Sequence, residues 1–132
     1  MSALSDYAEL AVLNVLTGRA TFTAPSAVYL ALGAGDFTDT GTAVSELSGN
    51  GYDRVAITFG TAAASGAISN TAAIAFPAAT GNQGTISHWK IMDANLATGG
   101  NCLMTGVFSA SKTIETNDIL QIAIGDLDLT AS

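Results

Sequence analysis

The residues of this chain that could do chemistry are few and widely spaced. A hydrolytic triad needs a nucleophile, a base and an acid that orients the base. His88 is the single histidine; it lies beside Trp89 in the alternating segment TISHWKIM (85–92), and the chain has no G-x-S-x-G elbow. We therefore expect His88 to be a structural or interface residue, and we expect no enzyme activity.

Metal and thiol chemistry have little support either. His88 and Cys102 stand fourteen residues apart and cannot form a zinc cage. Asp36, Asp39 and Glu46 could offer oxygen ligands to calcium, but they lack the D-x-D-x-D-G ladder, so a solvated acidic loop is expected. Cys102 is the single cysteine and lies in an apolar run, which predicts a buried, inert thiol and no intrachain disulfide.

The remaining carboxylates do not form an obvious pair of the kind that glycosidases place across a cleft. Most of them fall in turns or at strand ends, where aspartate is a common turn former. Neither G-x-G-x-x-G nor a P-loop pattern occurs, so no cofactor or phosphate site is predicted. The carboxylates considered are Glu46, Asp53, Asp93, Glu115, Asp118, Asp126 and Asp128.

The charge pattern excludes two classes of partner. The net charge is −7, and the four cations Arg19, Arg54, Lys90 and Lys112 are far apart in sequence. Nucleic acids and anionic membranes are bound by clustered cations, so we expect neither partner. Only 11% of the residues are charged, against an average of about 25%, so the surface can be buried against other proteins at little desolvation cost. We also expect no membrane span and no signal peptide, because Asp6 and Glu9 interrupt the N-terminus and no apolar run is long enough.

One helix is predicted, over residues 5–17. The hydroxyl of Ser5 can cap it, acidic residues suit its first turn, and Gly18 is placed to end it. Its apolar residues cover more than one face, so the helix can pack beside a sheet and also contact another subunit. The residues that we expect at such an interface are Leu10, Val12, Leu13 and Val15.

The rest of the chain reads as short strands separated by turns. A strand is predicted at 28–32 and another at 52–59, where Val55 and Ile57 share one face and Arg54 lies on the other. Further segments are a strand around 74–76, a hairpin of 85–92 with 102–108 joined by a turn at 93–101, a connection over 109–118, and a strand at 119–130 with a β-bulge at Gly125. This pattern predicts a single domain, 1–132, that is mainly β: an antiparallel β-sandwich or jelly roll with one N-terminal helix.

The segment 33–51 is too long for a simple connection and is a second candidate for contacts between subunits. Phe37 lies in its middle among polar residues. Such an aromatic is either an anchor for a neighbour's pocket or a lid on the chain's own core, and the sequence leaves both open.

Several segments, in this order and spacing, resemble a family of small bacteriophage virion proteins labelled head decoration or tail fiber proteins. These segments are LSDYAE (4–9), FTAPSAVYLAL (22–32), VSELSGNGYDRVAITFG (44–60), AISNTAAIAFP (67–77), TISHWKIMDA (85–94) and SKTIETNDILQIAIGDLDLT (111–130). The resemblance implies a structural role in the virion and a β-rich subunit that works as an oligomer. It brings no catalytic residues.

These observations together lead to an expected function. We expect a capsid decoration (cement) protein, assembled in the host cytoplasm, that binds the major capsid protein or other virion proteins. A homo-oligomer is expected, with a trimer favoured. The alternative is a tail fiber or baseplate module that binds glycans of the host surface.

Overall fold

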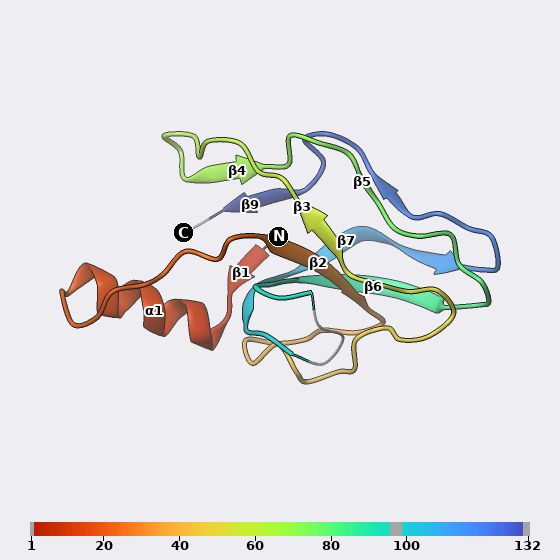
Figure 1. Cartoon of the computed structure of the whole chain (residues 1–132), viewed down its shortest axis with the longest axis horizontal. Coiled ribbons are helices and arrows are strands. Elements are labelled where there is room, and N and C mark those ends of the chain that lie inside the picture. Colours follow the sequence, from red (N-terminus) through yellow and green to blue (C-terminus); the bar gives the residue numbers. More distant parts are fainter. Residues whose placement is uncertain (1, 96–98, 131–132) are drawn as a thin grey trace.

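The computed structural model describes residues 2–95 and 99–130, and its largest element is an antiparallel sheet of five strands (Figure 1). The strand order is β1-β7-β6-β2-β3. Strands β6 and β7 form the predicted hairpin, with Trp89 opposite Gly106 and Met92 opposite Cys102; part of the predicted turn 93–101 lies outside the described residues. The bounds of the five strands are β1 Ser2–Leu4, β2 Val28–Gly33, β3 Val55–Ile57, β6 Gly84–Met92 and β7 Cys102–Ile114.

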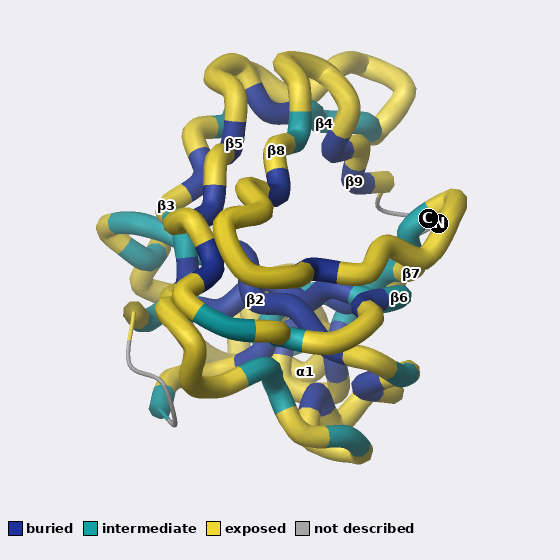
Figure 2. The backbone as a smooth tube through the Cα atoms, turned by 90° about the vertical axis from the view of Figure 1, so that its right-hand side faces the viewer, coloured by how far each residue is buried: buried dark blue, intermediate teal, exposed yellow. Residues whose placement is uncertain are grey.

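Two small antiparallel sheets cover one face of the large sheet. Strand β4 (Ala67–Ser69) pairs with β9 (Asp128–Thr130), and β5 (Ile74–Ala75) pairs with β8 (Gln121–Ile122). Two-stranded sheets this short are unstable alone, so packing must hold them. Buried side chains of the small sheets and their flanks, such as Ile74, Phe76 and Leu129, share one core with Leu30, Trp89 and others of the large sheet. Figure 2 shows buried backbone segments in the large sheet and in the small sheets.

The mainly β, antiparallel fold with one N-terminal helix is thus confirmed. The large sheet and the two small ones enclose the core between them, as the layers of a sandwich do. The jelly-roll connectivity stays a prediction.

Asn70 joins the two small sheets at their corner. Its side chain is buried; Nδ2 donates to the carbonyl oxygens of Ala72 (2.9 Å) and Ala123 (3.0 Å), and Oδ1 accepts from the Leu127 N–H (3.0 Å). The amide therefore forms hydrogen bonds with backbone groups that lie beyond the ends of the two small sheets. Buried backbone N–H and C=O groups need such partners.

Three predicted strand boundaries are wrong. The strand predicted at 52–59 is shorter and consists of β3 alone. Beyond Leu30 the edge of β2 bonds other groups: the Leu32 carbonyl accepts from the Leu47 N–H (2.9 Å), and the Leu32 N–H donates to the Tyr52 hydroxyl (3.1 Å). The predicted connection 109–118 is strand as far as Ile114, paired with β6. Gly125, with φ +82°, lies in a turn where the chain passes from β8 to β9 in different sheets, so no single strand carries a bulge there.

Gly106 lies against the indole of Trp89. A Cβ atom at position 106 would lie 2.1 Å from Trp89 Cζ2, well inside van der Waals contact. Trp89 is 4% exposed and belongs to the core, so the indole cannot swing away freely. The missing side chain of Gly106 is therefore what lets β7 cross the tryptophan.

We predict that Gly106→Ala lowers the free energy of unfolding by about 1–3 kcal/mol, the usual cost of overpacking. Urea unfolding followed by fluorescence or circular dichroism measures it. The same change should cost less in a Trp89→Phe background, because phenylalanine lacks the outer ring of the indole. Equal costs in the two backgrounds would show that the close contact is not the cause.

The predicted helix is confirmed as α1, Asp6–Leu16, with Ser5 as its N-cap. The Ser5 hydroxyl accepts from the Ala8 N–H (3.1 Å) and donates to the Cys102 carbonyl, so the cap also fastens the helix to β7. Gly18, with φ +71°, follows the C-cap Thr17. Helix α1 extends to one side of the sheets (Figure 1). No helix among residues 2–95 and 99–130 is long and apolar enough to cross a membrane.

Candidate functional site

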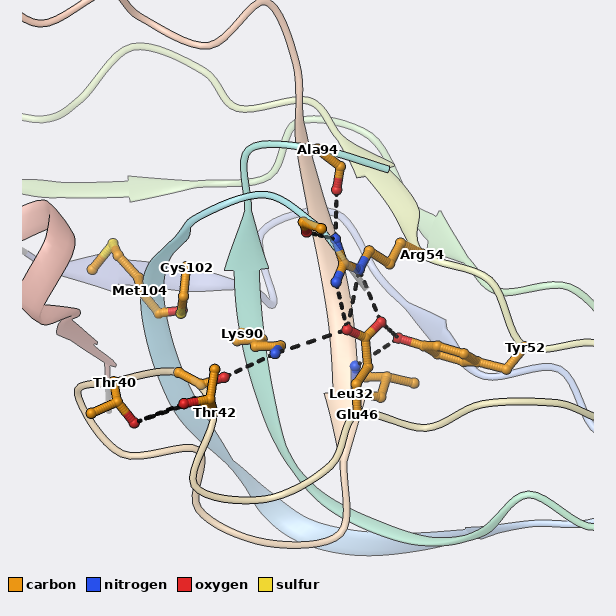
Figure 3. Close-up of polar contacts among 12 residues, drawn as sticks. Leu32, Thr40, Thr42, Glu46, Tyr52, Arg54, Lys90, Ala94, Cys102 and Met104 are labelled. Atoms are coloured by element: carbon orange, nitrogen blue, oxygen red, sulfur yellow. Dashed lines mark hydrogen bonds and ion pairs between the residues drawn. The ribbon is translucent and has the colours of Figure 1, made fainter. Parts of the chain in front are cut away.

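A buried ion pair joins the long loop 33–51 to the start of β3. The carboxylate of Glu46 accepts hydrogen bonds from Arg54 Nη2 (2.7 Å) and Arg54 Nε (2.9 Å), a bidentate contact (Figure 3). The side chains of Arg54 and Glu46 are 3% and 9% exposed. Arg54 Nη1 also donates to the carbonyl oxygens of Ala94 (2.7 Å) and Gly99 (3.0 Å). One guanidinium thus holds both ends of the β6–β7 connection as well as the loop.

Tyr52 and Lys90 complete this group, which we call the Glu46 cluster. The Tyr52 hydroxyl donates to Glu46 Oε2 (2.8 Å) and accepts from the Leu32 N–H. Lys90 Nζ lies 3.9 Å from Glu46 Oε1 and donates to the Gly41 carbonyl (2.9 Å). Its ammonium lies 4.6 Å from the centre of the Phe37 ring, a cation–π distance. Arg54 and Tyr52 thus hold the loop at Glu46, and Lys90 holds it at Gly41 and Phe37.

Burial shapes the pKa values of the cluster. It raises the pKa of Tyr52 well above its usual range, and the negative charge of Glu46 adds to the rise. Burial lowers the pKa of Lys90, and the attraction of Glu46 offsets this only in part. For Arg54 burial opposes the charge, but hydrogen bonding and attraction to Glu46 outweigh it, so the pKa of Arg54 is raised.

The cluster is satisfied internally. Among the described residues no buried side-chain nitrogen or oxygen lacks a hydrogen-bond partner. A carboxylate held by three donors is poorly placed to take a proton from a substrate, since its lone pairs are already engaged. We therefore interpret the Glu46 cluster as a clamp that fixes the loop.

Two sequence expectations change with this clamp. The prediction that the acidic residues of the loop are solvated is wrong for Glu46, whose side chain is 9% exposed and faces Arg54 and Lys90. Asp36 and Asp39 are exposed, as expected. Phe37 has no exposed surface, and its ring fills the space beside Gly33, where a Cβ atom would lie 2.3 Å from Cζ. Of the two alternatives, Phe37 is the lid on its own core, and in this conformation it offers no surface to a neighbour.

We predict that Tyr52→Phe lowers stability at pH 7 by about 1–3 kcal/mol, because Glu46 and the Leu32 N–H each lose a partner. Above pH 10 the unfolded chain releases the Tyr52 proton while the folded chain retains it, so stability of the wild type falls as pH rises. The variant lacks this contribution and should show a shallower decline in urea unfolding between pH 9 and 11. Tyr7→Phe, at an exposed tyrosine, is the matched control; an unchanged slope in Tyr52→Phe would contradict the assignment.

The other chemistry-bearing residues stay apart. His88 is half-buried, and its Nδ1 lies 2.7 Å from the hydroxyl of Ser87, its neighbour in β6. Cys102 is a buried free thiol, as predicted, and burial raises its pKa to about 11. In the described part of the chain no three His, Cys, Asp or Glu side chains gather where they could hold a metal ion.

The second notable surface is apolar and surrounds α1. Seven of the ten exposed large hydrophobic side chains in the described residues lie on or beside this helix. They form the α1 surface: Tyr7, Leu10, Val12, Leu13, Val15, Leu16 and Phe22. Ala8 is the helix residue that is buried, so the helix touches its own body along a narrow line. A groove of about 480 Å³ runs between the helix and the body, lined by residues such as Val12, Val15, Phe22, Leu103 and Met104.

The exposure of the α1 surface agrees with four of the five residues expected at an interface. Leu10 and Leu13 are 62% and 60% exposed, and Val12 and Val15 are 43% and 45% exposed. The contact itself stays a prediction. A family model described as "Podophage GP4 fiber I protein gp80" matches residues 3–130.

The chain belongs to this family. No curated protein matches it. Membership confirms the resemblance to phage virion structural proteins and makes this gp80-family chain a structural component of the virion. The match spans both the Glu46 cluster and the α1 surface.

Sequence reasoning missed the Glu46 cluster in this gp80-family protein. Glu46 and Arg54 are eight residues apart, separated by the turn 48–51. The predicted strand puts Arg54 on a sheet face, whereas the residue precedes β3 and is buried. One feature of the sequence could have indicated the cluster. The chain has four Lys and Arg residues, and two of them, Arg54 and Lys90, lie inside or beside strongly apolar segments.

Proposed function

We propose that this chain is a structural subunit of a phage fiber, held in the particle by protein–protein contacts that the α1 surface makes. The observation that carries the proposal is the exposed apolar helix. The family description, which names a fiber protein, favours a fiber over the capsid decoration expected from the sequence.

Beyond its acidic first turn, α1 is apolar over more than one face, and apolar helix faces are ordinarily buried. Full burial of one large aliphatic side chain is worth about 1.5–3 kcal/mol, and the α1 surface holds seven large apolar side chains, each 42–77% exposed. Burying these side chains against a partner releases free energy that offsets part of the entropy lost when two proteins associate. An interface is therefore the arrangement in which this helix is most stable.

The glycan-binding alternative has less support. Trp89 and Phe37 are buried, and the aromatic side chains that are clearly exposed among the described residues, Tyr7 and Phe22, belong to the apolar α1 surface. Stacking on sugars needs an open aromatic face beside polar groups that bind hydroxyls. The proposed role is thus assembly, with other virion proteins or further copies of the chain as partners.

The test is immunogold electron microscopy of particles of the encoding phage, with an antibody against this chain. Label confined to tail fibers supports the proposal. Even, dense label over the head would overturn it in favour of capsid decoration. Particles without label would overturn the place in a fiber altogether.

A further inference from the structure

The described surface carries two cations, and one of them stands at the end of α1. Arg54 and Lys90 are buried in the Glu46 cluster, which leaves Arg19 and Lys112 exposed. The Arg19 N–H binds the Asn14 carbonyl (2.8 Å), so Arg19 stays against the last turn of the helix. Asp6 and Glu9 occupy the first turn. The helix therefore has an acidic start, an apolar middle and a basic end.

We infer that the α1 surface packs against α1 of a second copy, with the two helices antiparallel. This inference rests on the proposed function and names the partner of its interface. Helix α1 rises roughly 15 Å from Asp6 to Leu16 at 1.5 Å per residue, and Arg19 lies just beyond that end, against the last turn. A two-fold axis near Leu13 then brings Arg19 of each copy within reach of Asp6 and Glu9 of the other, while Leu10, Leu13 and Leu16 interdigitate.

Charge argues for this arrangement over others. Each copy carries a net charge of −7, so two copies repel unless opposite charges meet at the contact. The antiparallel pair supplies two such meetings by symmetry, since a two-fold interface repeats every contact. A parallel bundle would gather the Asp6 and Glu9 side chains of all copies at one end and leave the Arg19 side chains at the other.

Size sets the expected strength. A stable interface buries about 800 Å² per partner with some 20–30 residues on each side. Helix α1 contributes eleven residues, and the groove beside it adds a few more, such as Phe22. We therefore expect a reversible dimer, in place of the trimer favoured from the sequence, and its formation should depend on protein concentration.

The test is a charge exchange, measured by analytical ultracentrifugation of the full chain. The wild type should form a dimer. Arg19→Glu should weaken dimerisation by about tenfold or more, as two contacts turn from attractive to repulsive, and so should the double change Asp6→Lys with Glu9→Lys. An equimolar mixture of the two variants should recover a heterodimer, because the introduced glutamate of one chain then faces the introduced lysines of the other. Circular dichroism checks that α1 is retained.

Lys112→Glu, at the other exposed cation, is the matched control and should leave the dimer intact. A monomeric or trimeric wild type, or a mixture that fails to recover, would overturn the antiparallel pair. Failure of the antiparallel pair is distinguishable from failure of the fiber role. A monomeric chain with label on tail fibers would overturn the pair and leave the fiber role standing. A dimeric chain without label on particles would overturn the fiber role and leave the pair standing.

Discussion

Glu46→Ala should lower the free energy of unfolding by about 3–5 kcal/mol, the typical result of removing one partner of a buried ion pair. The carboxylate neutralises Arg54 at 2.7 Å and lies 3.9 Å from Lys90. Its removal leaves two buried cations without a counter-charge and the Tyr52 hydroxyl without its acceptor. Most of the loss comes from that uncompensated charge.

Urea unfolding monitored by circular dichroism measures the change. Asp53→Ala is the matched control, because Asp53 is a carboxylate next to Arg54 in sequence but exposed, and it should change stability by less than about 0.5 kcal/mol. If Glu46→Ala cost no more than Asp53→Ala, the Glu46 cluster would not be the clamp of the loop 33–51.

Leu13→Asp should abolish incorporation into particles while leaving the fold in place. Leu13 is 60% exposed, so the isolated chain loses little packing, and aspartate in the helix costs about 0.5 kcal/mol in propensity. At an assembled interface the same carboxylate would be buried without a partner, which proteins tolerate poorly. Complementation of a phage that lacks the gene, followed by detection of the chain in purified particles, measures incorporation.

Ile119→Asp is the control for this experiment. Ile119 is 59% exposed and lies away from α1, just before β8, so the substitution introduces the same side chain at nearly equal exposure. Normal incorporation of Ile119→Asp together with loss of Leu13→Asp is the expected result. Normal incorporation of both variants would remove α1 as the assembly surface.

Local signals in the sequence determined the helix and the central hairpin. Ser5 and Gly18 marked the two ends of α1, because a hydroxyl cap and a residue with positive φ start and stop a helix through contacts within a few residues. The alternation in 85–92 and 102–108 predicted β6 and most of β7, since side chains of a strand point alternately to its two faces. The ordered segments also predicted the virion family, which the match over 3–130 confirms.

Only the tertiary structure decided where the polar residues go. Glu46 meets Arg54 and Lys90 because the loop 33–51 folds back along β2, a path set by contacts such as Leu47 to Leu32 that no local pattern encodes. The same long-range packing buries Phe37 against Gly33 and splits 119–130 between two sheets. Composition revealed a weakly charged, apolar chain; which apolar residues remain outside, on α1, depended on how narrowly the helix touches its own body.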